Sequence, residues 1–190
     1  GPDFSCPGAT PACVGCYAQK GRHQMHNVQN SFARNLNTLN HYEQTDNLVG
    51  CVKELSGLIE PGLFRIHESG DFHSQFAVDV WTALAALRDD VTFWFYTRSF
   101  NFDFSRLVAL DNVTGWASTD QYNQEQAKQF IEKFPSVRHA YGPLETTDSV
   151  PDNTVMCPVT TGKLDLDAAC TKCRLCTDKR MKKHIGFIKH

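Results

Sequence analysis

Seven of the eight cysteines in this 190-residue chain form two groups, one near each end. The N-terminal group has the spacing C-x6-C-x2-C, and the C-terminal group has the spacing C-x12-C-x2-C-x2-C. Thiolates at such spacings can converge on one metal ion or cluster without straining the chain. We therefore predict that both groups are metal ligands: Cys6, Cys13, Cys16, Cys157, Cys170, Cys173 and Cys176.

The spacing of the C-terminal group favours an iron–sulfur cluster over zinc. Three cysteines at two-residue intervals are typical of bacterial ferredoxins, in which a remote cysteine completes the ligand set. Cys157 is the expected remote ligand, so the cysteine-rich segment spans residues 157–176. A set of four cysteines also suits a structural zinc ion, although zinc sites more often use two separated C-x2-C pairs.

The N-terminal group supplies only three ligands to a [4Fe–4S] cluster. The remaining iron can take a fourth cysteine or an outside molecule. The sequence leaves open whether the chain holds one cluster or two, and whether the C-terminal cysteines bind iron or zinc. The eighth cysteine, Cys51, lies in an apolar helical stripe and is expected to be a buried thiol.

A disulfide framework is the main alternative to metal binding. Such frameworks occur in short secreted chains with more than about 8% cysteine, which cannot build a sufficient core. This chain has 8 cysteines in 190 residues and is 41% hydrophobic, so it can bury a core without staples. We expect reduced thiols and a reducing, cytoplasmic compartment. The initial Gly1-Pro2 is typical of the remnant that a protease leaves in an expressed protein.

Charge and hydropathy limit the expected partners. The net charge is −2, so a broad phosphate-binding surface is not expected. The basic segment Lys179–His184 is the exception, and we interpret it as a solvated turn, with a local nucleic-acid contact as the alternative. No apolar run approaches the roughly 18 residues of a membrane span, so no membrane association is expected.

Strand-like and helix-like segments alternate between the two cysteine groups. The apolar periodicity predicts helices at residues 16–40, 48–58, 74–87, 104–110 and 124–134. Strands are expected at 63–67, 91–97, 114–118, 137–141, 155–156 and 185–188. This alternation predicts a single α/β domain with parallel strands. Since a complete eightfold barrel needs about 250 residues, we expect a partial or open (β/α) barrel with cysteine-rich terminal loops.

Polar residues follow each of the first four expected strands. The carboxyl ends of parallel strands form the ligand face of α/β folds, so these residues are candidates for a site. His67, Glu68, Asp71 and Arg98 are the candidates for proton handling or substrate contact. We interpret His23 and His26, which follow the N-terminal cysteines, as solvated surface residues.

Several of these segments together resemble the phage gene product 88 family. The matching segments are Cys6–Thr10, Cys16–Ala18, Phe64–Phe72, Tyr96–Ser99 and the closing C-x2-C-x2-C. These segments are distributed from one end of the sequence to the other, so the resemblance extends over most of the chain. The resemblance implies a phage protein that acts in the cytoplasm of the infected host cell.

A more distant resemblance is to phage proteins with radical S-adenosylmethionine (SAM) barrels. It implies that Cys6, Cys13 and Cys16 hold a [4Fe–4S] cluster whose open iron is chelated by SAM. It also implies a one-electron reaction on a small-molecule substrate, supplied by an electron donor. The cofactor-binding residues would be Glu68, Gly70, Asp71, Ser118 and Asp120, with Arg98 beside the cofactor or substrate.

Two features of the sequence depart from the radical SAM pattern. The first cysteine gap is six residues where that pattern has three, and Gly15 replaces the aromatic residue before the last cysteine. Three hypotheses therefore stand beside one another. They are a radical-SAM-like enzyme, a fully cysteine-ligated iron–sulfur protein for redox or sensing, and a zinc-stabilised binding module.

Overall fold

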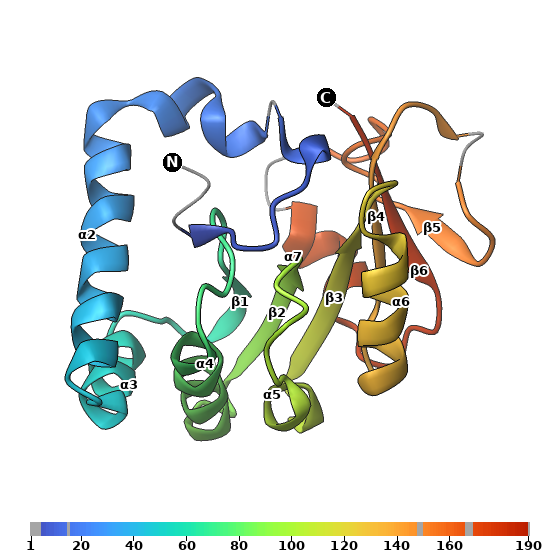
Figure 1. Cartoon of the computed structure of the whole chain (residues 1–190). Helices are drawn as coiled ribbons and strands as arrows, with labels where there is room; N and C mark the ends of the chain where they lie inside the picture. The colour runs from blue at the N-terminus through green and yellow to red at the C-terminus, as the bar shows by residue number, and fades with distance from the viewer. Residues whose placement is uncertain (1–4, 15, 148–149, 166–168, 190) are drawn as a thin grey trace.

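The core of the fold is a six-stranded, entirely parallel sheet with the strand order β1-β2-β3-β4-β6-β5 (Figure 1). The computed structural model describes residues 5–14, 16–147, 150–165 and 169–189. The strands are β1 (Gly62–Ile66), β2 (Val91–Thr97), β3 (Val113–Thr119), β4 (Arg138–Leu144), β5 (Thr154–Met156) and β6 (His184–Ile188). The sheet is open, with β1 and β5 at its edges, as expected for a partial barrel. Gly1-Pro2 and Gly15 lie outside the described residues.

Strand β2 shows why the sheet is buried on both faces. Val91, Phe93, Phe95 and Thr97 point to one face, and Trp94 points to the other, yet all five are buried. Both faces of an all-parallel sheet are covered by other elements, so its strands are continuously apolar rather than alternating. The backbone register pairs Phe93 with Phe64 of β1 and with Val113 of β3.

One face of the sheet is covered by the crossover helices. Figure 1 shows α4 (Gln75–Leu87), α5 (Ser105–Ala109) and α6 (Gln124–Lys133) in front of the strands. Ser74 caps the N-terminus of α4, because its side chain accepts a hydrogen bond from the Ala77 N–H at 3.2 Å. The main hydrophobic core lies between these helices and the sheet.

The opposite face is covered by the C-terminal cysteine-rich segment. This segment includes α7 (Ala169–Cys173) and the 3₁₀ turn η5 (Leu175–Thr177). A second, smaller core packs Trp116, Ala140 and Ile185 of the sheet against Leu175 and Met181. Residues of the basic Lys179–His184 segment also join this layer. Lys179 Nζ donates to the Leu110 carbonyl at 2.5 Å, and the Arg138 guanidinium donates to the Lys179 and Met181 carbonyls.

The N-terminal region differs from the single long helix expected at residues 16–40. It contains three 3₁₀ turns, η1 (Pro11–Cys13), η2 (Tyr17–Gln19) and η3 (Gly21–Gln24), before α2 (His26–Gln44). Gly21 has a φ of +53°, which interrupts a helix and favours glycine. Helix α3 (Leu48–Ser56) follows and packs beside α4. None of the helices in the described ranges combines the length and apolar character that crossing a membrane requires.

Candidate metal centres

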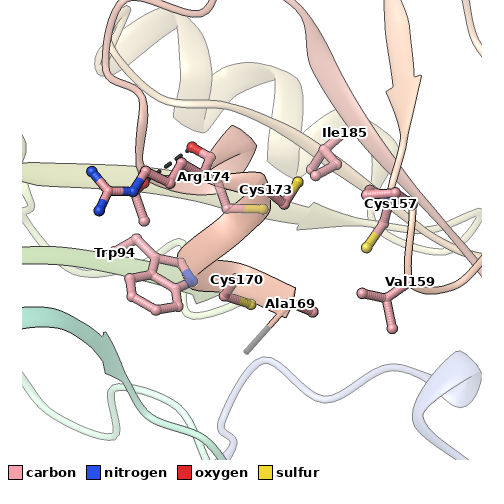
Figure 2. A pocket seen from close by; sticks show the side chains of 11 residues that line it. Trp94, Cys157, Val159, Ala169, Cys170, Cys173, Arg174 and Ile185 are labelled. Carbon is pink, nitrogen blue, oxygen red and sulfur yellow. Dashed lines mark hydrogen bonds between the residues drawn. The ribbon is translucent and has the colours of Figure 1, made fainter. Parts of the chain in front are cut away.

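The four C-terminal cysteines converge on one cavity. Cys157 follows β5, Cys170 and Cys173 lie on α7, and Cys176 lies on η5. All four line a small cavity with a volume of about 30 Å³. Figure 2 shows three of these side chains around the cavity, with Trp94 at its border.

The local backbone explains how three cysteines at short spacing reach the same cavity. Arg174 has a φ of +55°, a left-handed conformation that ends α7 and starts η5. The Arg174 N–H donates to the Cys170 carbonyl at 3.0 Å, and the Thr177 N–H donates to the Arg174 carbonyl at 3.1 Å. Cys157 is held on the opposite side, because its N–H donates to the Gly186 carbonyl of β6 at 2.8 Å.

The thiols of this group influence one another electrostatically. Burial, with smaller contributions from negative charge on Cys157, Cys170 and Cys173, raises the pKa of Cys176 to about 12. A hydrogen bond donated by the Tyr96 hydroxyl opposes this increase. The buried Cys176 thiol is therefore protonated at pH 7, and a metal that binds it would have to displace its proton.

The donor arrangement differs from a compact single-ion site. Among the described residues, no group of three or more His, Cys, Asp or Glu side chains is arranged to hold one metal ion. Tetrahedral zinc with Zn–S bonds of about 2.3 Å brings its thiolates to about 3.8 Å from one another. A four-iron cluster places each thiolate on a different iron, so its ligands are farther apart. The described cysteines around this cavity therefore form no preformed site for a single metal ion.

The N-terminal cysteines form the second group. Cys13 closes η1 by donating its N–H to the Thr10 carbonyl at 2.9 Å, and Cys16 donates to the Cys13 carbonyl at 3.0 Å. Burial, together with the nearby charge of Asp71, raises the pKa of Cys6 to about 11. Thiolates at Cys13 and Cys16 also contribute to this increase, so the three thiols are electrostatic neighbours.

The segment Ser5–Tyr17, here called the cysteine loop, docks on the carboxyl ends of β1, β2 and β3. The Asp71 N–H after β1 donates to the Ser5 carbonyl at 2.6 Å. Gly8 lies so close to the backbone after β2 that a Cβ atom there would approach the Arg98 oxygen to 2.0 Å. The Tyr17 hydroxyl donates to the Glu68 carbonyl. The cysteine loop therefore lies at the edge of the sheet where α/β folds bind ligands.

Asp71 joins the segment after β1 to the end of β2 with a buried carboxylate. Its Oδ1 accepts from the Phe72 N–H and the Thr97 hydroxyl, each at 2.8 Å, and its Oδ2 accepts from the Arg98 N–H at 2.7 Å. Burial raises the pKa of Asp71, while these hydrogen bonds lower it. Both carboxylate oxygens already have partners within the protein.

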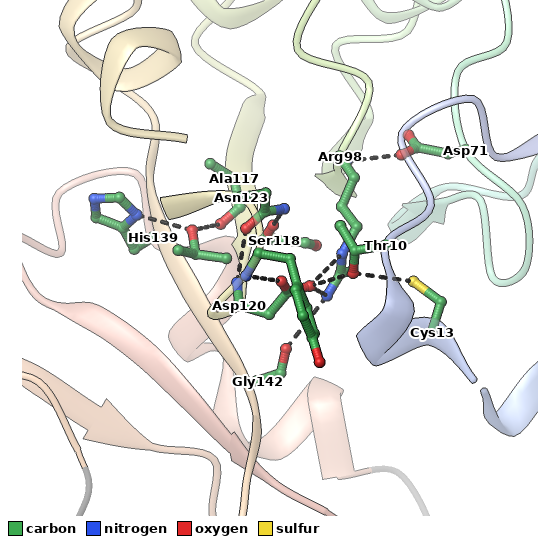
Figure 3. A network of polar contacts seen from close by, with 12 residues as sticks. Thr10, Cys13, Asp71, Arg98, Ala117, Ser118, Asp120, Asn123, His139 and Gly142 are labelled. Carbon is green, nitrogen blue, oxygen red and sulfur yellow. Dashed lines mark hydrogen bonds and ion pairs between the residues drawn. The ribbon is translucent and has the colours of Figure 1, made fainter. Parts of the chain in front are cut away.

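Arg98 and Asp120 form the second connection (Figure 3). Arg98 Nε and Nη2 donate to Asp120 Oδ2 at 3.2 and 3.1 Å, and Nη2 also reaches the Gly142 carbonyl at 3.3 Å. The Thr10 hydroxyl donates to the same Asp120 oxygen at 2.7 Å. Thr10 Oγ1 lies 3.9 Å from Cys13 Sγ, so Asp120 connects β3 to the cysteine loop.

The other candidate residues surround this docking site in different ways. Gly70 has a φ of +82° and lies against Ser5, and Ser118 is buried at the end of β3. Glu68 is exposed and lies 3.4 Å from Arg22 and 3.6 Å from His23 Nε2. His23 is buried rather than solvated, because it packs against Tyr17 and Phe32.

His67 faces the helix-covered core and not the cysteine loop. Its ring packs edge-on against Phe72, with centroids 4.6 Å apart, and against Trp81 at 6.0 Å. Burial lowers the pKa of His67 to about 3, with smaller contributions from the charges of His73 and Arg65. It is therefore neutral at pH 7.

Three residues at the site were not among the sequence candidates. Thr10 contacts Asp120, Tyr96 donates to Cys176, and Arg65 Nη2 donates to the Tyr17 hydroxyl at 3.2 Å. An arginine in the middle of an otherwise apolar strand was the available signal for Arg65. The partners of Thr10 and Tyr96 depend on long-range packing and have no local signal.

Comparison with known proteins agrees with the family resemblance. Residues 2–179 match the family model described as Gene product 88. The Gene 88 protein of Mycobacterium phage L5 is 30% identical over 193 residues, which covers 95% of this chain and 81% of the relative. The corresponding protein of Mycobacterium phage D29 is 29% identical over 195 residues, with the same coverage of both chains. No solved structure gives a significant match. This chain therefore belongs to the Gene product 88 family, whose members include bacteriophage proteins.

Proposed function

We propose that this chain is an iron–sulfur protein with two [4Fe–4S] sites. Cys157, Cys170, Cys173 and Cys176 would hold one fully ligated cluster, and Cys6, Cys13 and Cys16 would hold a second cluster with one open iron. When bound, such clusters supply one-electron transfer. The observation that carries the proposal is the convergence of four cysteines from β5, α7 and η5 on one cavity.

The protein residues around each site have distinct roles in this proposal. Trp94, Val159 and Ile185 surround the C-terminal cysteines and restrict water. Thr10 and Asp120 fix the position of Cys13 through the cysteine loop. Polar residues at the strand ends then lie beside the three-cysteine site, where an outside ligand would reach the open iron.

SAM is the proposed ligand of that open iron, in a radical-SAM-like reaction on a small-molecule substrate. The position of the cysteine loop at the carboxyl edge of a parallel sheet supports this assignment. Glu68, with its exposed carboxylate, would contact the cofactor directly. Gly70 and Ser118 lie beside the same loop. Asp71 would act by positioning Cys6.

A second candidate is a redox or sensing protein that does not use SAM. The specific observation in its favour is that Asp71 and the Asp120 Oδ2 atom are already occupied by internal hydrogen-bond donors. In this case the open iron would accept another ligand. Incubation of the reduced, anaerobically reconstituted protein with SAM discriminates the two, because only a radical-SAM-like enzyme should release 5′-deoxyadenosine. Absence of both SAM binding and cleavage would leave the second candidate.

Single cysteine variants test the proposed C-terminal site. Cys157→Ala, Cys170→Ala, Cys173→Ala and Cys176→Ala should each lose about half of the iron bound by the parent chain. Cys51→Ala is the matched control, because Cys51 is buried in α3 away from both groups. Full iron and sulfide content in all four variants would contradict ligation by these cysteines.

A further inference from the structure

Arg65 lies between the two cysteine groups. It belongs to β1, and its side chain is on the sheet face that the C-terminal segment covers, because the neighbouring Phe64 and Ile66 belong to the core beneath the helices. Its Nη2 donates to the hydroxyl of Tyr17, the residue next to Cys16. Its guanidinium carbon lies 5.1 Å from the centre of the Tyr96 ring.

Tyr96 connects this guanidinium to the C-terminal cysteines. Its hydroxyl donates to Cys176, and its ring presents one face to Arg65. The charge of Arg65 also lowers the pKa of Cys170, against the larger increase caused by burial. The Arg65 charge therefore influences Cys170, and its guanidinium contacts the ring of Tyr96, which is hydrogen-bonded to Cys176.

Among the described residues, the half-buried Arg65 side chain has few polar partners. Arg65 Nε is buried and has no hydrogen-bond partner among the described residues. No carboxylate is paired with Arg65 in the described part of the chain. Since buried charges are normally paired, an anionic group nearby would compensate this cation. A cluster with four thiolate ligands carries such a negative charge.

We propose that Arg65 is a positioning residue that raises the reduction potential of the C-terminal iron–sulfur centre. This inference rests on the proposed function. When the centre accepts one electron from a low-potential donor, it gains one negative charge and no bond is made or broken. A nearby cation stabilises the more negative, reduced state, which raises the potential. Tyr17 holds the guanidinium in place, so docking of the cysteine loop sets the position of the charge.

The test isolates the C-terminal centre in the full-length chain. Replacing Cys6, Cys13 and Cys16 with alanine leaves this centre alone, and a dithionite titration followed by electron paramagnetic resonance gives its potential. In this background, Arg65→Gln should shift the potential to a more negative value. Arg65→Lys keeps the charge and should stay near the parent. Arg22→Gln removes one equal charge from an exposed side chain and is the matched control.

Two results would overturn the inference in distinguishable ways. If the centre forms and Arg65→Gln leaves its potential unchanged, the inference is wrong while the proposed function stands. If the parent protein binds no iron, both are wrong, and this is evident before any titration. Should Arg65→Gln fail to fold, Tyr17→Phe takes its place. It should give a smaller negative shift, and an unchanged potential would again contradict the inference.

Discussion

At the scale of single residues, Asp120 is the connection on which the cysteine loop most depends. Its carboxylate is buried, forms an ion pair with the Arg98 guanidinium and accepts a hydrogen bond from the Thr10 hydroxyl. Removing one partner of a buried ion pair typically costs about 3–5 kcal/mol, because the other charge is left uncompensated. Arg98 is partly exposed, so the lower end of this range applies.

We therefore expect Asp120→Asn to reduce the free energy of unfolding by about 3 kcal/mol, measured by urea denaturation. Glu145→Gln is the matched control, since Glu145 pairs with Lys189 at 3.0 Å and both side chains are exposed. Exposed pairs contribute little, so the control should change stability by less than about 0.5 kcal/mol. Equal effects of the two substitutions would show that Asp120 does not hold the loop.

His67 gives the fold a pH dependence. Its folded-state pKa of about 3 lies below the ordinary value of about 6.5, so the folded protein binds fewer protons than the unfolded chain. Its contribution is complete above pH 6.5 and is lost as the pH falls towards 3. The unfolding free energy should fall by an amount on the order of 3 kcal/mol between pH 6.5 and pH 4 because of this group.

His67→Asn should remove this part of the pH dependence in urea denaturation at several pH values. Asparagine tolerates the φ of +57° at this position. His26→Asn, on the exposed first turn of α2, should leave the slope unchanged. A parent-like slope in His67→Asn would assign the acid sensitivity to other groups, such as His139, whose pKa burial lowers to about 4.

At the scale of elements, the decisive feature is the close approach of the cysteine loop to the end of β2. Gly8→Ala would place a methyl group 2.0 Å from the Arg98 carbonyl oxygen. The loop would have to move, so we expect a cost of about 1–3 kcal/mol in unfolding free energy and less iron at the three-cysteine site. Gly57→Ala is the matched control, because its Cβ would meet its nearest neighbour at an ordinary 3.6 Å. An unchanged Gly8→Ala protein would contradict the docking geometry.

Most elements were predictable from the sequence, for physical reasons that β2 illustrates. Its β-branched and aromatic residues form a buried strand, and the predicted bounds Val91–Thr97 are confirmed. Helix α4 has a clear apolar stripe and a Ser74 cap, and its predicted end at Leu87 is also confirmed. The turns before α2 were not predicted, because their conformation depends on docking to distant strand ends. The apolar stripe of α2 continued the helical pattern in the sequence, but none of its residues is buried.

At the scale of the whole molecule, the two cysteine groups occupy different places on one sheet. The C-terminal segment covers the face opposite the helices, and the cysteine loop covers the carboxyl edge. The spacing of the cysteines indicated two groups, but it did not indicate where on the sheet each group lies. Strand β6 inserts between β4 and β5, and this order brings Cys157 and Ile185 to the cavity that α7 and η5 also line. Strand order depends on crossover connections, which local patterns do not encode.

We propose that this chain binds iron and sulfide through its two cysteine groups. Metal and acid-labile sulfide analysis of the protein, purified without oxygen, tests it most directly. We expect about eight iron atoms per chain, with an equal amount of sulfide and little zinc. Replacing Cys6, Cys13 and Cys16 with alanine should lower this to about four. A protein that contains stoichiometric zinc and no sulfide would contradict iron–sulfur binding at these cysteines.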